Sequence, residues 1–251
     1  MTMKCLFLAA GYATRLYPLT QNYPKPLLDV GGKPILEWLV EDLKGLVEEF
    51  VVISNHKFMP HFDQWAKILN ARENRKIRVI DDGTISNETR LGAVRDIQFA
   101  AQKLGINDEC LVMAGDNMLD FSLKGFVDFS RNSGTSCVMC HEEHRVEALR
   151  KTAVITVNAD GLITSYEEKP KEPKGCLAVP PFYFYQAEDL CRIPEALEEG
   201  CGYDAPGSFA AWLSTKTPMH AYVMPGKRYD IGDRKSYDEV CGLFQKTIAI
   251  R

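Results

Sequence analysis

Strand-like and helix-like segments alternate along the first half of the chain. Residues 4–10 form a nearly continuous apolar run, as expected of a strand buried on both faces. A helical stripe of apolar residues follows from Pro34 to Val47, and residues 50–54 return to a strand-like run. The order continues with a helix at 60–69, a strand at 76–80, a helix at 91–104, a strand at 110–114, a helix at 123–130 and a strand at 135–140. This alternation predicts an α/β fold with a Rossmann-like, mixed and mainly parallel sheet that is flanked by helices.

The second half of the chain has a different pattern. Two predicted strands, 153–157 and 162–166, are joined by Asn158-Ala159-Asp160-Gly161, which is a hairpin signal. We expect further elements in the order of an aromatic strand at 182–185, helices at 188–197 and 208–214, a strand at 219–224, a turn from 229 to 232 and a last helix at 233–246. The absence of a linker or low-complexity tract favours a single domain over 1–251, with a first part of about residues 1–150 and a second of about 151–251.

Composition excludes several classes of protein. The formal net charge is −4, from 30 basic and 34 acidic residues, and no long basic run is present, so nucleic acid is not an expected partner. The apolar run near the N-terminus is too short for a signal peptide, and no stretch could span a bilayer, so we expect a cytoplasmic protein that does not bind membranes. Eight cysteines would then remain thiols. Cys137 and Cys140 face opposite sides of a predicted strand, which favours packing over metal binding.

The loop that follows the first strand carries the strongest chemical signal. Small residues after Leu8, namely Ala9, Ala10 and Gly11, allow close approach to a ligand, and backbone N–H groups there can bind phosphate oxygens. Arg15 and Lys25 add two cations. A triphosphate that loses pyrophosphate needs such charge. The alternative is an ordinary glycine-containing turn with two solvated cations, and the spacing fits neither the dinucleotide-binding nor the P-loop pattern.

Three later segments carry charged residues, two of them at the ends of predicted strands and one in a predicted turn. Asp116 follows the strand at 110–114, where a carboxylate could hold Mg²⁺ over phosphates or simply cap a turn. Glu168-Lys169-Pro170 ends another strand, and Tyr229-Asp230-Ile231-Gly232 precedes the last helix. Taken alone, the Glu-Lys pair is equally typical of a solvated strand end.

Together these segments resemble the sugar-nucleotide pyrophosphorylases, and in particular glucose-1-phosphate thymidylyltransferase-like enzymes. The loop reads Gly-x-x-Thr-Arg-x-x-Pro-x-Thr, then Pro-Lys-Pro-Leu, then a proline at the next helix start. The matching residues are Gly11, Thr14, Arg15, Pro18, Thr20, Pro24, Lys25, Pro26, Leu27 and Pro34. Asp116, Glu168-Lys169-Pro170 and Asp230-Ile231-Gly232 then follow in the order of the family, so the resemblance covers nearly the whole chain.

The resemblance implies a GT-A-type fold and a specific reaction. A nucleoside triphosphate and a sugar 1-phosphate would give a nucleotide sugar and pyrophosphate, with Mg²⁺ held by Asp116 and Asp230. Arg15, Lys25 and Lys169 would be the catalytic cations. The nucleotide-binding residues would be Leu8, Ala9, Ala10, Gly11, Thr14, Arg15, Lys25, Gly92 and Asp116, and the sugar-binding residues Thr152, Glu168, Lys169 and Pro181. Gly92 could lie against the base or serve simple packing. A homodimer is the default expectation.

Two departures from the family pattern leave the acceptor open. Thr152-Ala153 stands where the family often has an aromatic residue followed by glycine, and Pro180-Pro181 where it often has Thr-Gly. A thymidylyl- or uridylyltransferase of glucose 1-phosphate is the first hypothesis. A cytidylyltransferase acting on a non-sugar phosphate such as phosphocholine, and a non-catalytic nucleotide-binding regulator, remain alternatives. A glycosyltransferase would require an Asp-x-Asp motif, which Asp116-Asn117-Met118 lacks.

Overall fold

The chain forms two compact units whose segments interleave in sequence. The computed structural model describes residues 3–248, with side chains up to residue 245. Unit 1 contains the N-terminal segment through Leu6, Leu91–Met113 and Lys124–Pro225. Unit 2 contains Phe7–Arg90, Ala114–Leu123 and the chain from Gly226 onward. Strands β1 (Lys4–Leu8) and β6 (Cys110–Ala114) each begin in unit 1 and end in unit 2.

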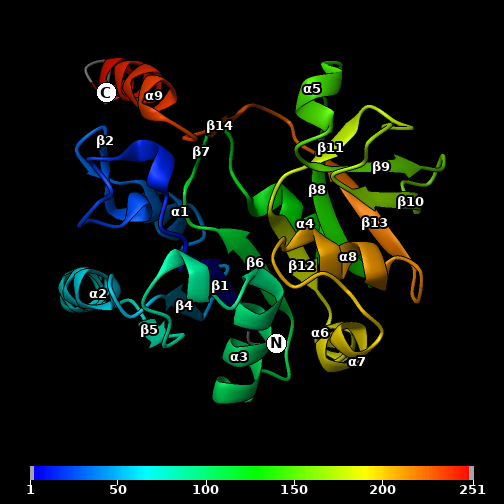
Figure 1. Cartoon of the computed structure of the whole chain (residues 1–251), viewed down its shortest axis with the longest axis horizontal. Coiled ribbons are helices and arrows are strands. Elements are labelled where there is room, and N and C mark those ends of the chain that lie inside the picture. The colour runs from blue at the N-terminus through cyan, green and yellow to red at the C-terminus, as the bar shows by residue number, and fades with distance from the viewer. Residues whose placement is uncertain (1–2, 249–251) are drawn as a thin grey trace. The chain divides into compact units, whose positions relative to one another are not determined.

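Unit 1 holds the larger, mostly antiparallel part of the sheet. The order is β10-β9-β11-β8-β12-β6 and then the start of β1, with β13 beside β8 in parallel (Figure 1). The strands are β6 (Cys110–Ala114), β8 (Ser136–Glu142), β9 (Ala153–Val157), β10 (Ile163–Glu168), β11 (Leu177–Val179), β12 (Phe182–Tyr185) and β13 (Met219–Val223). The helices are α3 (Ala93–Leu104), α4 (Lys124–Ser133), α5 (Val146–Leu149), α6 (Ala187–Leu190), α7 (Ile193–Glu198) and α8 (Gly207–Leu213). Four consecutive aromatic residues in β12 are fully enclosed, which explains this strand's place inside the sheet.

Unit 2 contains parallel strands and two small two-stranded ribbons. Strands β1 and β4 are neighbours, and β4 pairs in parallel with β5. In Figure 1, helix α9 lies beside β2, where the Tyr237 hydroxyl donates to the Asp29 carbonyl at 2.7 Å. The strands are β1 (Lys4–Leu8), β2 (Asp29–Val30), β3 (Lys33–Pro34), β4 (Glu49–Ser54), β5 (Ile77–Asp81), β7 (Asn117–Leu119) and β14 (Arg228–Asp230). The helices are α1 (Ile35–Asp42), α2 (Met59–Glu73) and α9 (Arg234–Ile248), with 3-10 turns η1 (Thr14–Leu16), η2 (Lys25–Leu27) and η3 (Asn87–Thr89).

The expected fold class is confirmed: helices flank a mixed α/β sheet that is parallel around β4 and β5. The single predicted helix at 188–197 is wrong, because the structure has two short helices, α6 and α7, separated at Cys191 and Arg192. Pro194 lies in the first turn of α7, where its missing N–H costs no hydrogen bond, whereas inside one long helix it would. The predicted turn at 229 is also wrong, because residues 228–230 form β14 and pair with β7. Strands β7 and β11 were not predicted, since each has only three residues.

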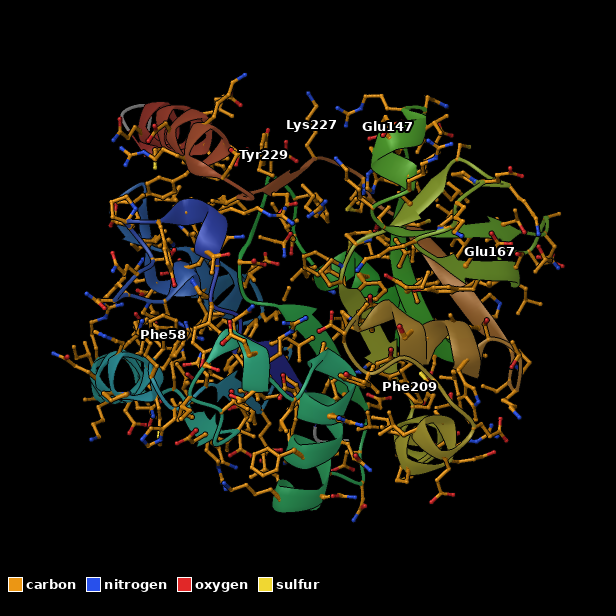
Figure 2. All side chains as sticks on the ribbon, viewed as in Figure 1. Phe58, Glu147, Glu167, Phe209, Lys227 and Tyr229 are labelled. Atoms are coloured by element: carbon orange, nitrogen blue, oxygen red, sulfur yellow. The ribbon has the colours of Figure 1, made fainter. Side chains whose placement is uncertain are left out.

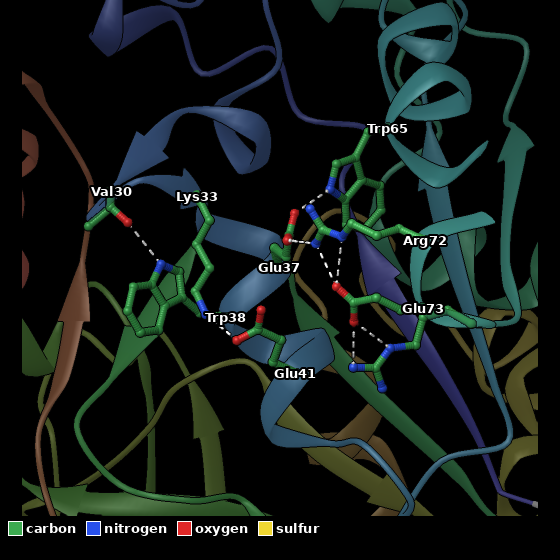
Figure 3. Close-up of polar contacts among 9 residues, drawn as sticks. Val30, Lys33, Glu37, Trp38, Glu41, Trp65, Arg72 and Glu73 are labelled. Carbon is green, nitrogen blue, oxygen red and sulfur yellow. Dashed lines mark hydrogen bonds and ion pairs between the residues drawn. The ribbon is translucent and has the colours of Figure 1, made fainter. Parts of the chain in front are cut away.

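A polar network ties α1 to α2 in unit 2 (Figure 3). Arg72 donates to the buried Glu37 carboxylate at 2.7 Å and to Glu73 at 2.5 Å. Carboxylate oxygens of Glu37, Glu41 and Glu73 lie within 4.8 Å of one another, a spacing that could suit a metal ion. Each of these carboxylates is paired with a cation, Glu41 with Lys33 and the other two with Arg72, so the cluster is accounted for by packing between the helices.

Within residues 3–248, no helix is both long and apolar enough to cross a membrane.

Candidate active site

Buried contacts hold the loop after β1 in unit 2. The Ala9 amide donates to the Ile53 carbonyl at 3.0 Å and is therefore used by the sheet. Asn55, fully buried just beyond β4, donates from Nδ2 to the Ala10 carbonyl at 2.8 Å and accepts at Oδ1 from the Phe58 amide at 2.9 Å. The loop is thus fixed to the start of α2. Of the loop amides, those after Ala9 are the ones we expect to bind phosphate.

The segment around Arg15 combines a fixed backbone with an open surface. Ala13 has left-handed backbone angles (φ 46°), and its carbonyl accepts a hydrogen bond from the buried Thr20 hydroxyl at 2.8 Å. Thr14 and Arg15 follow in η1 and are exposed. Gly11 is exposed as well, and a Cβ built on it would meet nothing within 4 Å. The structure therefore leaves room for a ligand beside this loop, and no partner of the Arg15 side chain is found among the described residues.

Lys25 and Asp116 form the central charge pair of unit 2. Lys25 Nζ lies 2.6 Å from Asp116 Oδ2, although 91 residues separate the two in the chain. The Lys25 side chain is only 10% exposed and that of Asp116 31%. Asn117 Nδ2 donates to the other Asp116 oxygen at 3.1 Å, so both oxygens are oriented by neighbours. A half-buried carboxylate with this orientation is suited to a cation or a phosphate-bound metal ion.

Strand pairing brings Asp230 next to this pair. Asp230 on β14 lies opposite Asn117 on β7, one residue beyond Asp116. Directly opposite residues in an antiparallel pair have Cα atoms about 4.5–5.5 Å apart. Arg228 Nη1 donates to Asn117 Oδ1 at 2.7 Å and lies 3.9 Å from Asp230 Oδ1. The two carboxylates expected to bind a metal ion therefore lie on the last residue of β14 and on the residue just before β7.

The apolar neighbours of these charged residues share one core. Leu16 follows Arg15, Met118 lies two residues after Asp116, and Ile231 follows Asp230; all three are at most 1% exposed. The same cluster takes in Leu28, Val30, Ile35, Val240 and Phe244. Tyr229, labelled in Figure 2, packs edge-on against Phe244 with ring centroids 5.8 Å apart. Burial of each such side chain contributes about 1.5–3 kcal/mol. The shared apolar cluster therefore holds the loop, β7 and β14 together.

We expect Asn55→Ala to loosen the loop. The variant loses both side-chain hydrogen bonds and leaves the buried Ala10 carbonyl and Phe58 amide without partners, at a cost of about 1–3 kcal/mol each. Urea unfolding should show the loss of stability. Asn22→Ala, an exposed change in the same loop, is the control. Equal unfolding midpoints for the two variants would contradict this role.

All four residues predicted to bind the acceptor belong to unit 1, and backbone pairing brings Thr152, Glu168 and Lys169 together. Glu168 on β10 pairs with Ala153 on β9, and the Lys169 amide donates to the Thr152 carbonyl at 3.1 Å. The Thr152 hydroxyl donates to the Val179 carbonyl at 2.9 Å, two residues before the half-buried Pro181. Lys169 is exposed and has left-handed backbone angles (φ 49°). Burial raises the pKa of the Glu168 carboxyl, and the Lys169 charge partly offsets this effect.

Gly92 is required by packing inside unit 1. Its φ is +92°, and a Cβ there would come 2.6 Å from the Tyr203 carbonyl oxygen. The next amides, of Ala93 and Val94, donate to the carbonyls of Asp204 and Tyr203 at 3.2 and 2.9 Å. The packing alternative therefore explains this glycine, and a position against the nucleobase stays a prediction.

Three residues with a clear place in the site were not singled out from the sequence. Asn55 anchors the loop, Asn117 orients Asp116, and Arg228 links Asn117 to Asp230. Asn55 and Asn117 had a usable signal, since each is a polar residue just after a buried strand of a parallel sheet, where ligands gather. Arg228 had none, because its role depends on the unpredicted pairing of β14 with β7.

This chain is similar to known proteins over nearly its whole length. Residues 4–246 match the family described as Nucleotidyl transferase. The UTP–glucose-1-phosphate uridylyltransferase AglF of Haloferax volcanii is 26% identical over 243 residues, covering 94% of this chain and 94% of its own length. Mannose-1-phosphate guanylyltransferase 1 of Arabidopsis thaliana is 28% identical over 243 residues, covering 94% of this chain and 63% of its own length.

A solved structure shares the fold over nearly the full length. The crystal structure of UDP-glucose pyrophosphorylase complexed with UDP-glucose superposes with a TM-score of 0.82 at 23% sequence identity, covering 98% of this chain and 100% of that one. The resemblance drawn from the loop and the three later segments is thereby confirmed at the level of the family. This chain belongs to the nucleotidyl transferase family.

Proposed function

We propose that the protein couples a nucleoside triphosphate to a sugar 1-phosphate, giving a nucleotide sugar and pyrophosphate. The observation that carries the proposal is the cluster in unit 2, where Lys25 contacts Asp116 and β14 brings Asp230 beside Asn117. A cation and two carboxylates, together with an exposed loop where a Cβ on Gly11 would meet nothing within 4 Å, suit a triphosphate with its metal ion. The relatives named above act on sugar 1-phosphates and supply the acceptor class.

Asp116 and Asp230 would hold the metal ion, which we propose to be Mg²⁺. The donor set fits, since Mg²⁺ usually takes one or two carboxylates and completes its shell with water and substrate phosphates. When bound, the ion would neutralise phosphate charge. Lys25 would contact the triphosphate and keep Asp116 oriented, and Arg15 would stabilise the charge that develops on the leaving pyrophosphate.

The reaction would proceed by in-line attack of an oxygen of the sugar phosphate on the α-phosphorus. That nucleophile is already an anion, so the site needs positioning and charge neutralisation rather than a strong base. In unit 1, Lys169 would neutralise the sugar phosphate and Glu168 would accept hydrogen bonds from sugar hydroxyls. Thr152 and Pro181 would contact the sugar.

A cytoplasmic location is part of the proposal and is supported by cysteines that are free thiols within residues 3–248.

The test is a panel of nucleoside triphosphates against sugar 1-phosphates and phosphocholine, with pyrophosphate release as the readout. We expect turnover with at least one sugar 1-phosphate and a strict requirement for a divalent ion, removable with EDTA. Turnover with phosphocholine alone would favour the non-sugar alternative. No release of pyrophosphate with any substrate pair in the presence of Mg²⁺ would overturn the proposed activity and favour a regulatory nucleotide-binding role.

A further inference from the structure

Glycine at position 207 makes space for the Glu168 carboxylate in unit 1. Gly207 is the first residue of α8, which packs against β10. A Cβ built on Gly207 would overlap Glu168 Oε2, and would lie 3.1 Å from Glu168 Cδ and 3.3 Å from the Tyr166 hydroxyl. Tyr166 and Glu168 are two residues apart on β10 and so share one face of the strand. Any side chain at position 207 would have to displace the carboxylate.

Neighbouring aromatic residues fix the position of α8. Phe209, labelled in Figure 2, is fully buried, and its ring centroid lies 5.1 Å from that of Tyr185 on β12 and 6.1 Å from that of Trp212. The helix therefore cannot easily move away to accommodate a larger residue at 207. The Glu168 carboxylate is the end of a flexible side chain, so it is the group that would move.

The carboxylate held in this space has acceptor capacity to spare. Within the described part of the chain, no donor forms a hydrogen bond to Glu168, and burial raises its pKa. The adjacent Tyr166 hydroxyl is buried and has Tyr183 as its neighbour, so the carboxylate of Glu168 is the group left without a donor. Buried polar groups without partners are costly unless a ligand satisfies them. A ligand with hydroxyl donors would satisfy the Glu168 carboxylate, whereas a quaternary ammonium has no N–H to donate.

We propose that Gly207 is a positioning residue for the acceptor: the absence of its side chain lets Glu168 occupy the place from which it binds a polyhydroxyl acceptor. This inference rests on the proposed function, because it assigns the acceptor to the Glu168 side of unit 1. Gly207 itself touches no substrate. Its φ lies outside the left-handed region, and alanine is favourable in a helix, so the requirement for glycine is spatial rather than conformational.

The experiment compares Gly207→Ala with the wild-type protein in the pyrophosphate-release assay. We expect the KM for the sugar 1-phosphate to rise about tenfold or more, as for the loss of a hydrogen bond to a charged group, with the KM for the triphosphate within about twofold. Gly242→Ala, a helical glycine whose Cβ would meet nothing within 4 Å, is the matched control and should leave both constants unchanged. An unchanged acceptor KM in an active Gly207→Ala enzyme would overturn the inference.

A double-variant cycle separates positioning from general structural damage. Glu168→Asp shortens the side chain and is expected to raise the acceptor KM by itself. Adding Gly207→Ala to Glu168→Asp should then have little further effect, because the shorter carboxylate no longer fills the space beside residue 207. Fully additive effects would contradict the proposed link between the two residues.

A second readout does not depend on turnover. Carbon-13 NMR titration of the Glu168 carboxyl should show a raised pKa in the wild type that falls toward the ordinary value in Gly207→Ala, as the carboxylate moves toward water. An identical titration in the two proteins would reject the inference whatever the activity. Failure of the wild type to use any acceptor, with the titration shifted as expected, would reject the proposed function and with it acceptor binding, while the placement of the Glu168 carboxylate by Gly207 would stand.

Discussion

Asp116→Asn is expected to lower kcat by on the order of 10³-fold, because it removes one of two carboxylates proposed to hold the metal ion. Asparagine keeps the size of the side chain and can still accept the hydrogen bond from Lys25, whose Nζ lies 2.6 Å from the Asp116 oxygen. The loss of stability should therefore be small, about 1–2 kcal/mol. Turnover measured by pyrophosphate release, with folding checked by circular dichroism, tests the prediction.

The dependence on metal concentration distinguishes this role from a loss of folding. Asp230→Asn should also reduce turnover, and in both variants the Mg²⁺ concentration required for half-maximal activity should rise, since one charged ligand is lost. Asp160→Asn, an exposed change in the hairpin turn between β9 and β10, is the control and should match the wild type. Turnover within about threefold of the wild type, with an unchanged Mg²⁺ requirement, would refute the assignment of Asp116.

The order of elements could be predicted because it depends on local pattern. The apolar run that became β1 and the stripe that became α3 each carry their own periodicity, and both were found near their predicted bounds. The three-residue strands β7 and β14 have too few residues for any period. They exist because Asn117, Met118 and Leu119 find partners more than 100 residues away, which is information that a local pattern does not contain.

In the candidate site, too, some features could be predicted from local sequence and others depend on tertiary contacts. Arg15, Lys25 and Asp116 could be singled out because residue type and position at a strand end already indicate their chemistry. The direct contact of Lys25 with Asp116 and the neighbouring place of Asp230 depend on tertiary pairing. The role of Gly207 could not be predicted from the sequence. It depends on the tertiary contact with Glu168, which a side chain at position 207 would overlap. The interleaving of the two units could not be predicted either. Residues 114–123 belong to unit 2, although the segments on both sides of them in the chain belong to unit 1.

Arg15→Ala is expected to lower kcat by about 10²-fold or more while leaving stability within about 0.5 kcal/mol of the wild type. The reason lies in the exposure of Arg15 and in its lack of a partner among the described residues, so its removal breaks no interaction of the fold. The neighbouring Leu16 stays buried in the core and keeps the loop in place. Lys67→Ala, an exposed change on α2, controls for the loss of one positive charge.

The direction of the reaction identifies what Arg15 binds. If Arg15 stabilises charge on the leaving pyrophosphate, the reverse reaction should show a raised KM for pyrophosphate and a nearly unchanged KM for the nucleotide sugar. Arg15→Lys should fall between the wild type and Arg15→Ala, because lysine keeps the charge but cannot form the two parallel hydrogen bonds that a guanidinium offers a phosphate. An unchanged KM for pyrophosphate in Arg15→Ala would place the arginine away from the leaving group, and the phosphate contacts of the loop would then come from Lys25 and backbone amides.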